Sequence, residues 1–376
     1  MKISIISPML SQNSLGRAYL LAKVLSRKYK VEIIGPTVEG VIWFPCNTGE
    51  FRYKSAPYCN YPFFFRSKRQ LLNLISGDVI YASKLLPTSF GIGLARKEKQ
   101  GTPLILDIDD WETGFFLDRG TISKTEECLK ICEPLSLFNI RRIEKHYKFA
   151  DTITTVSNFL KNRYGGHGII VPHGRDTEAL NPLNFNRVEL RRKYGIDTNK
   201  VITFLGTPRW RKGLNVLIKA VKLAKRKEIR LMIIGGPMEN GFVQKAKEDL
   251  GDRIIFMGMQ TFSKIPEFLS VADLVVIPQL RTFGTEGQVP AKIFDAMAMA
   301  KPIIATAVSD IPTIIDGCGW IINPGNTEEL SETIEYVFCH PREAEEMGRK
   351  AREKCKKKYS WDTMENILTN IFDRYV

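Results

Sequence analysis

Two stretches in the second half of the chain place charged side chains beside glycines, in patterns that suit phosphate and sugar hydroxyls. In the first, residues 204–213 (FLGTPRWRKG), an apolar run is followed by Arg209, Arg211 and Lys212 and then by Gly213. Cations in a loop before a helix, together with the first N–H groups of that helix, form an anion site. Such fixed cations would stabilise the charge that grows on a departing diphosphate, although a solvated basic loop has the same composition.

The second stretch, Thr285–Pro302, reads TEGQVPAKIFDAMAMAKP. Glu286 opens a glycine-containing loop, and residues 291–300 have the apolar spacing of a helix. Asp295 falls on a different face of that helix from the apolar residues, so its carboxylate is placed to accept hydrogen bonds from ribose or sugar hydroxyls. An amphipathic core helix with one exposed acid is the competing interpretation.

Further polar residues follow the apolar runs of the first half. Asp107, Asp109 and Asp110 lie in LDIDDW, and clustered carboxylates bind a divalent cation or position hydroxyls, although caps and turns use the same residue types. Ser11–Gly16 carries one glycine, which either lets the loop approach a ligand or makes a tight turn. Tyr58–Arg69 (YCNYPFFFRSKR) fits a patch that dips into an anionic membrane and fits equally a buried loop with a basic edge.

The composition narrows the classes of protein. The chain has 376 residues and a net charge of +14, which favours an anionic partner, yet no nucleic-acid recognition motif is present. No apolar run approaches the ~18 residues that span a bilayer, and the start lacks a signal-peptide cleavage site, so we expect a cytoplasmic protein. Cys128 and Cys132 are four residues apart without matching histidines, which predicts reduced thiols rather than a zinc site.

Strand-length apolar runs alternate with helix-length amphipathic stretches along the whole chain, which predicts an α/β fold with parallel sheets. The pattern restarts after Pro172, and linker-type residues occupy Val171–Asn181, so two successive doubly wound units are expected. The predicted strands are residues 2–7, 31–35, 78–82, 103–108, 152–156, 201–205, 230–234, 254–257, 274–277 and 302–305. Sites in such sheets form outside the carboxyl ends of the strands, where the loops above lie.

Several motifs together resemble the retaining glycosyltransferases of the GT-B fold, family 4, also called glycosyl transferases group 1. FLGTPRWRKGLNVLIKA, LMIIGG, IIFMGM, VADLVVIPQ and EGQVPAKIFDAMAMAKPIIAT follow the family's order and spacing, and TVSNFL with VPHGRDTE looks like its interdomain linker. The resemblance covers roughly residues 145–330, and the first 140 residues match in layout only. It implies two Rossmann-like domains facing each other across a cleft: an acceptor domain over 1–172 and a donor domain over 173–360, with a last helix over 361–376 packing back on the first domain.

The resemblance also implies residue roles. Lys212 falls on the family's phosphate lysine, Arg209 (in competition with Arg211) on its arginine partner, and Asp295 on the second acid, which contacts the ribose. The expected catalytic residues are Arg209, Lys212 and Asp109, and the expected donor-binding residues are Gly16, Arg209, Lys212, Met257, Glu286, Gly287, Lys292 and Asp295. Three departures stand out: the second acid is Asp rather than Glu, the first acid falls on Gly287 with Glu286 one place early, and Asp109 takes roughly the place of a histidine.

The implied function is transfer of a hexose-type sugar from a UDP or GDP donor to a hydroxyl of a glycan or lipid-linked precursor, with retention and without a metal or cofactor. The expected partners are therefore the nucleotide-sugar donor, this acceptor and an anionic membrane surface, with no nucleic acid and with the oligomeric state open. The expected location is the cytoplasm, with peripheral binding to the inner face of the cell membrane. Two alternatives stay open: a sugar-nucleotide epimerase of the same architecture and a non-catalytic nucleotide-sugar binding protein.

Overall fold

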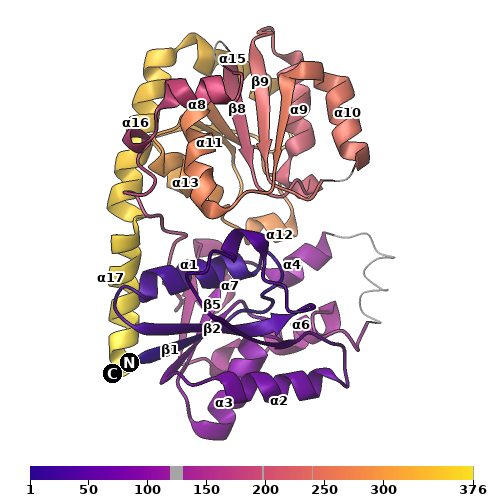
Figure 1. The fold of residues 1–376 in the computed structure, drawn as a ribbon, viewed down its shortest axis with the longest axis vertical. Coiled ribbons are helices and arrows are strands. Elements are labelled where there is room, and N and C mark those ends of the chain that lie inside the picture. Colours follow the sequence, from indigo (N-terminus) through magenta and orange to yellow (C-terminus); the bar gives the residue numbers. More distant parts are fainter. Residues whose placement is uncertain (119–129, 197–198, 239, 376) are drawn as a thin grey trace. The chain divides into compact units, whose positions relative to one another are not determined.

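The computed structural model describes residues 1–118, 130–196, 199–238 and 240–375, which form two compact units (Figure 1). The first unit comprises Met1–His173, Glu286–Val289 and Asp362–Val376, and the second comprises Gly174–Thr285 and Pro290–Trp361. Cys128 lies outside the described residues, so the interpretation of the Cys128–Cys132 spacing is left as a prediction.

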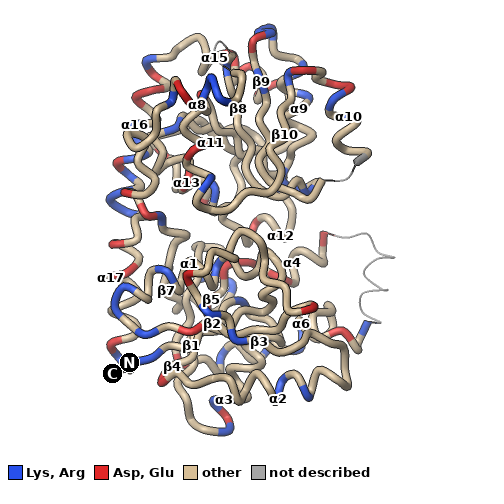
Figure 2. Tube along the Cα trace, in the orientation of Figure 1, with Lys and Arg blue, Asp and Glu red and all other residues tan. Residues whose placement is uncertain are grey.

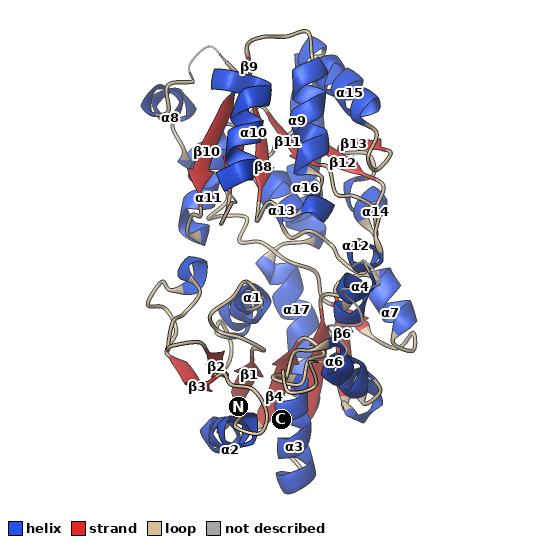
Figure 3. Cartoon of the chain, turned by 90° about the vertical axis from the view of Figure 1, so that its right-hand side faces the viewer, coloured by secondary structure: helices blue, strands red, loops and turns tan. Residues whose placement is uncertain are grey.

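The first unit is built on a parallel sheet with the described strands in the order β3-β2-β1-β4-β5-β6-β7. The strands are β1 (Lys2–Ile6), β2 (Lys30–Thr37), β3 (Tyr53–Pro57), β4 (Val79–Ser83), β5 (Leu104–Ile108), β6 (Thr152–Thr155) and β7 (Ile169–Ile170). Its helices are α1 (Leu15–Leu25), α2 (Phe64–Leu74), α3 (Phe90–Gln100), α4 (Glu112–Leu117), α6 (Leu137–Glu144), α7 (Asn158–Arg163) and α17 (Trp361–Phe372). α1 covers one face of the sheet and α2 and α3 cover the other, so the central strands β4 and β5 are buried throughout (Figure 3).

The second unit repeats this plan with the described strands in the order β10-β9-β8-β11-β12-β13, all parallel. The strands are β8 (Lys200–Leu205), β9 (Ile229–Ile234), β10 (Ile254–Gly258), β11 (Leu274–Ile277), β12 (Ile303–Thr306) and β13 (Trp320–Ile322). Its helices are α8 (Arg187–Lys193), α9 (Leu214–Leu223), α10 (Asn240–Leu250), α11 (Ile265–Val271), α12 (Phe283–Glu286), α13 (Lys292–Ala298), α14 (Ile311–Ile315), α15 (Thr327–Cys339) and α16 (Pro341–Lys358).

The apolar faces of three helices cover one side of the sheet in the second unit. On α9, Leu214, Leu217, Ile218 and Val221 recur at the spacing of one helix face and are buried against the sheet. α10 and α15 complete the same layer, and α9, α10 and α15 lie together on one face of the strands in Figure 3. This packing fixes the start of α9, and with it the loop that follows β8.

The order of the strands creates one switch point in each sheet. In the first unit the chain leaves β1 toward β2 and later leaves β4 toward β5, so the connections diverge between β1 and β4. In the second unit they diverge in the same way between β8 and β11. In open parallel sheets, ligand sites are found at such switch points, outside the carboxyl ends of the strands.

The fold confirms the predicted α/β class and corrects several predicted elements. Helical spacing in the sequence predicts a first helix over Leu15–Tyr29, whereas α1 ends at Leu25. The helix expected over 291–300 spans only Lys292–Ala298. Strands β3, β7 and β13 were not predicted. Half of the aromatic and basic segment Tyr58–Arg69 belongs to helix α2, not to a loop.

Helix α17 follows all of the second unit along the chain and belongs to the first unit from Asp362 onward. Phe372 is fully buried, and its ring lies 5.4 Å from that of Tyr81 on β4. The hydroxyl of Tyr29 donates a hydrogen bond of 2.7 Å to Asp373, and the hydroxyls of Thr152 and Tyr375 are 2.7 Å apart. Residues far apart in the sequence thus complete one core (Figure 1).

Lysines and arginines are interspersed with acids over the elements of each unit (Figure 2). Within the described part of the chain, none of the helices combines the length and the apolar character that crossing a bilayer requires.

One position in the turn after α13 stores backbone strain. Ala300 has φ 53, in the left-handed region that an L-residue with a Cβ adopts only at a cost of ~1–2 kcal/mol. We expect Ala300→Gly to raise the free energy of unfolding by about 0.5–1 kcal/mol, because relief of this strain exceeds the added entropy of the unfolded chain.

Chemical denaturation measures the effect, and Ala298→Gly inside α13 is the control, expected to destabilise by about 1 kcal/mol or more. Destabilisation by both substitutions would contradict the prediction.

Candidate functional site

Two glycines shape the loop that follows β8 at the switch point of the second sheet. Gly206 has φ 112 and Gly213 has φ 71, both in the left-handed region. A Cβ on Gly213 would lie 1.7 Å from the carbonyl oxygen of Pro278, so only glycine allows the start of α9 to approach the end of β11. The loop and the end of β11 are therefore held together by backbone packing.

Lys212 lies in this loop and contacts the residue that follows the end of β11. Its Nζ donates a hydrogen bond of 3.1 Å to Oε1 of Gln279, a side chain with 1% exposure. The N–H of Leu280 donates to the carbonyl of Arg211 at 2.9 Å. Arg209, three residues earlier, is exposed. The structure thus places a positioned lysine and an exposed arginine at the switch point, as a phosphate site requires.

Asp295, on α13, forms an ion pair with Arg175 that sequence reasoning did not anticipate. The Arg175 guanidinium holds both carboxylate oxygens, with Nε bonded to Oδ1 and Nη2 3.0 Å from Oδ2. Nη2 also donates to the carbonyl of Ala291 at 3.0 Å. Each carboxylate oxygen keeps a second lone pair, so Asp295 can still accept a hydroxyl while Arg175 fixes its orientation.

Two further donor candidates of the second unit lie near the carboxyl ends of its strands. Met257 is on β10, and its carbonyl accepts a hydrogen bond of 2.5 Å from Nε2 of Gln260. Lys292 is the first residue of α13, and its Nζ lies 4.5 Å from the ring centroid of Phe204 on β8. Burial lowers the pKa of Lys292 to about 8, although Asp295 acts in the opposite direction.

Glu286 and Gly287 belong to the short segment Glu286–Val289, which is grouped with the first unit. A Cβ on Gly287 would lie 2.5 Å from the Cβ of Trp111, so a side chain does not fit there. The neighbouring Gln288 donates from Nε2 to Oδ1 of Asp110 at 2.6 Å. The position onto which the family's first acid falls thus packs closely against Trp111, and Glu286 is the residue directly before it in the sequence.

At the switch point of the first sheet, Gly16 lies beside a buried ion pair. Arg17, on α1, donates from Nε and Nη2 to the two oxygens of Asp107, each at 2.9 Å, and both side chains are at most 1% exposed. Arg17 also donates to the carbonyls of Val171 and Pro172 at 2.9 Å. Asp107 is therefore a structural partner of Arg17.

The other two acids of LDIDDW surround Lys84, a residue that sequence reasoning missed. Lys84 follows β4, is 5% exposed and has φ 72. Its Nζ contacts Oδ1 of Asp109 at 2.8 Å, Oε1 of Glu112 at 2.9 Å and Oδ2 of Asp110. One cation thus faces three carboxylates, and non-glycine left-handed residues of this kind cluster at functional sites. The only signal in the sequence is a lysine directly after a buried strand.

Replacing Asp109 by asparagine is expected to stabilise the first unit, and the gain should grow as the pH is raised from 4.5 to 8. Burial raises the pKa of Asp109 by more than attraction to Lys84 lowers it. A carboxyl with a raised folded pKa contributes stability that is present below its unfolded pKa of ~3.9 and is lost as the pH rises through the folded value. Asparagine keeps that contribution, so at pH 8 we expect a gain of at least about 1 kcal/mol.

Denaturation curves at both pH values check this. A clear loss of stability in Asp109→Asn at pH 8 would mean that Lys84 holds Asp109 ionised.

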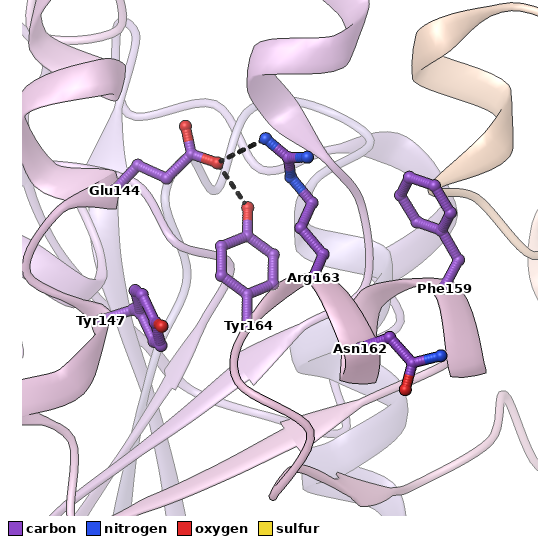
Figure 4. Close-up of a pocket in the computed structure, with 6 residues that line it drawn as sticks. All are labelled: Glu144, Tyr147, Phe159, Asn162, Arg163 and Tyr164. Carbon is purple, nitrogen blue, oxygen red and sulfur yellow. Dashed lines mark hydrogen bonds and ion pairs between the residues drawn. The ribbon is translucent and has the colours of Figure 1, made fainter.

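The first unit also contains a pocket of about 520 Å³ that includes none of the predicted site residues (Figure 4). Its lining residues are Glu144, Tyr147, Phe159, Asn162, Arg163 and Tyr164. The carboxylate of Glu144 accepts a hydrogen bond of 2.8 Å from Tyr164, and the Arg163 guanidinium stacks 3.7 Å from the ring centroid of Trp111. Aromatic walls with a few fixed polar groups are typical of small-ligand pockets.

Comparison with known proteins connects these features to a family. Residues 199–340, which carry the β8 loop, Lys212, Lys292 and Asp295, match the family described as glycosyl transferases group 1. This part of the chain is therefore similar to that family. The group 1 region thus contains the switch point of the second sheet.

Two curated relatives match part of the chain. The chain is 26% identical over 234 residues to a GDP-mannose-dependent monoacylated alpha-(1-6)-phosphatidylinositol monomannoside mannosyltransferase of Corynebacterium glutamicum, covering 59% of this chain and 61% of the relative. It is 27% identical over 203 residues to the alpha-D-kanosaminyltransferase of Streptomyces kanamyceticus, covering 52% and 50%. The alignments thus span about half to three-fifths of the length of these group 1 relatives.

Solved structures show the fold of the whole chain. HepE of Anabaena, determined with UDP and glucose, superposes with a TM-score of 0.77 at 16% identity, covering 99% of both chains. WaaG, a glycosyltransferase involved in lipopolysaccharide biosynthesis, superposes with a TM-score of 0.74 at 15% identity, covering 98% of this chain and 99% of WaaG. Two Rossmann-like sheets of the GT-B kind are therefore confirmed for this chain.

Proposed function

We propose that the protein transfers a hexose-type sugar from a nucleoside diphosphate donor to a hydroxyl of a glycan or lipid-linked acceptor, with retention of configuration. The observation that carries the proposal is the loop after β8. It combines left-handed glycines with Lys212 at a sheet switch point, inside the region that matches the group 1 family. HepE was solved with UDP and glucose, and the relative from Corynebacterium is named for its GDP-mannose dependence.

In this proposal a donor domain over residues 173–360 binds the nucleotide sugar, and an acceptor domain over residues 1–172, together with the last helix, binds the acceptor. Lys212 and Arg209 neutralise the leaving diphosphate, which stabilises the transition state more than the bound donor. Asp295, oriented by Arg175, accepts hydrogen bonds from the ribose, and Met257 lies toward the base. Asp109 interacts with the acceptor or the transferred sugar, and Gly16 lets the first unit's loop approach the donor.

Donor incubation tests the proposal against its two competitors. The purified chain is incubated with GDP-mannose and with UDP-glucose, with and without a panel of glycan and lipid-linked acceptors, and the sugar and nucleotide products are separated. Acceptor-dependent release of UDP or GDP supports the transferase. A changed sugar that is still attached to its nucleotide, formed without acceptor, would instead identify an epimerase, and tight binding without turnover would identify a binding protein.

We also propose that the protein works in the cytoplasm, peripherally on the inner face of the cell membrane, through the start of α2. Phe63 and Phe65 are 72% and 63% exposed, whereas Phe64 between them is 1% exposed and anchors the helix. Arg66 and Arg69 are exposed beside them. Two exposed rings with adjacent cations match the chemistry of an anionic lipid surface.

The double substitution Phe63→Ser and Phe65→Ser is expected to weaken binding to anionic vesicles by about tenfold or more, because each ring contributes up to ~1.5–3 kcal/mol when it leaves water. Co-sedimentation with vesicles of graded phosphatidylglycerol content measures the change. Leu183→Ser, at an 89% exposed position of the second unit, is the matched control. Binding that ignores anionic lipid content, or that survives the double substitution, would exclude this surface.

A further inference from the structure

The ammonium group of Lys292 has no counter-ion in direct contact. Its Nζ lies over the Phe204 ring at 4.5 Å, and it makes no hydrogen bond or ion pair with any residue that the structure describes. Lys292 is half-buried, and a cation that loses part of its hydration without a counter-ion carries a cost in free energy. An aromatic face offsets only part of that cost.

Three other cations near this end of the second sheet have polar partners. Lys212 donates to Gln279, and Arg175 is held by Asp295. Lys301, buried just after α13, donates to the carbonyls of Ser270 and Ala272 at 2.9 and 3.0 Å. Each of these three side chains has a polar partner in the fold, and Lys292 has none among the residues that the structure describes.

A glycine borders the ammonium group of Lys292. A Cβ on Gly206 would lie 3.0 Å from Nζ of Lys292, so glycine at this position leaves space beside the ammonium. Gly206 itself packs against Gly235, where a Cβ would lie 2.4 Å from the carbonyl oxygen of Gly206. The ammonium thus borders the start of the same loop that carries Lys212. Asp295, three residues further along α13, is the acid whose charge raises the pKa of Lys292, and Asp295 itself forms an ion pair with Arg175.

We infer that Lys292 is a further diphosphate ligand of the donor site, binding the phosphate oxygens through its ammonium group from across the glycine loop. This inference rests on the proposed function and adds to it a residue that contacts the reacting phosphate.

The protonation state of Lys292 distinguishes a diphosphate ligand from a lysine with a purely structural role. Burial lowers the pKa of Lys292 to about 8, with Asp295 as the opposing influence. A diphosphate beside the amine favours the charged form, so binding near pH 8 draws a proton from the buffer onto Nζ. The affinity for diphosphate should therefore be highest below this pH and decrease above it.

Titration calorimetry on the full chain tests the inference with inorganic pyrophosphate, UDP and GDP as probes at pH 7 and pH 9. Lys292→Met is expected to bind pyrophosphate and at least one nucleotide about 10–100-fold more weakly at pH 7, the loss of one charge-assisted hydrogen bond. Lys292→Arg should bind well at both pH values, because arginine stays protonated. Lys219→Met, an exposed charge loss on α9, should behave as the unaltered chain.

Proton uptake, measured in buffers of different ionisation enthalpy at pH 8, should disappear in both Lys292 variants. Unchanged pyrophosphate affinity in Lys292→Met, or a failure of the unaltered chain to bind pyrophosphate, overturns the inference. Pyrophosphate binding that needs Lys292, without binding of UDP or GDP, would leave Lys292 as an anion ligand and contradict the proposed donor. If Lys292→Met does not fold, Lys292→Arg still tests the inference. Its pyrophosphate affinity should then fall less between pH 7 and pH 9 than that of the unaltered chain, and an equal fall overturns the inference.

Discussion

Replacing Lys212 by alanine is expected to lower the rate of sugar transfer by about 10²–10³-fold, the effect of removing one preorganised charge-stabilising donor. The hydrogen bond from Lys212 to the buried Gln279 holds the amine at the switch point before the donor arrives. Charge on the leaving diphosphate is larger in the transition state than in the bound donor, so kcat should fall more than donor affinity.

Steady-state kinetics with the active donor and acceptor measure this change. Lys219→Ala removes an exposed lysine from the adjacent helix and should leave kcat unchanged. Lys212→Arg should recover part of the rate, because it restores the charge but not the point geometry of an ammonium group. A Lys212→Ala variant with full transfer activity would show that the β8 loop does not hold the diphosphate.

Replacing Arg17 by methionine is expected to cost about 3–5 kcal/mol of the stability of the first unit, the cost of leaving one member of a buried ion pair uncompensated. Asp107 would lose both hydrogen bonds from the guanidinium and keep those from Thr154 and Tyr81, at 2.8 and 3.3 Å. The carbonyls of Val171 and Pro172 would lose a donor as well. Three separate segments of the first unit therefore lose their common contact.

Urea denaturation, followed by a probe in the first unit, measures the loss. Lys28→Met is the matched control: its ion pair with Asp373 has side chains 42% and 49% exposed, and such surface pairs contribute only ~0–1 kcal/mol. The double variant Arg17→Met with Asp107→Leu should recover part of the stability, since it removes the buried charge altogether. Equal effects of Arg17→Met and Lys28→Met would contradict a buried pair.

The central strands and their order along the chain could be predicted from the sequence, because strands buried on both faces are continuous apolar runs. Val201–Leu205 and Leu274–Ile277 are examples, and both occur within a residue of their predicted bounds. β3 (YKSAP) escaped prediction because it is a short edge strand that carries polar residues. α2 escaped because its apolar positions, Phe64 and Leu71, are obscured by the neighbouring exposed phenylalanines.

Long-range ion pairs could not be predicted, because spacing reports only local periodicity. Arg175 and Asp295 are 120 residues apart in the sequence, and Lys84 meets acids from the end of the next strand. Arg17 did leave a local signal: it lies four residues before Leu21, on the apolar stripe of its helix. A charged residue on an apolar stripe predicts a buried partner, but only the folded structure shows which residue that partner is.

Helix α17 has a consequence for the order in which the protein forms during synthesis. Every described residue of the second unit leaves the ribosome before Asp362–Phe372, which fill the face of the first sheet beside Tyr81. Domains generally form from the N-terminus onward as the chain emerges. Here the nascent first unit lacks part of its core until the second unit has been translated, so the later-made unit can complete its packing first. The earlier-made unit meanwhile exposes an apolar face, which is the surface that a chaperone would recognise.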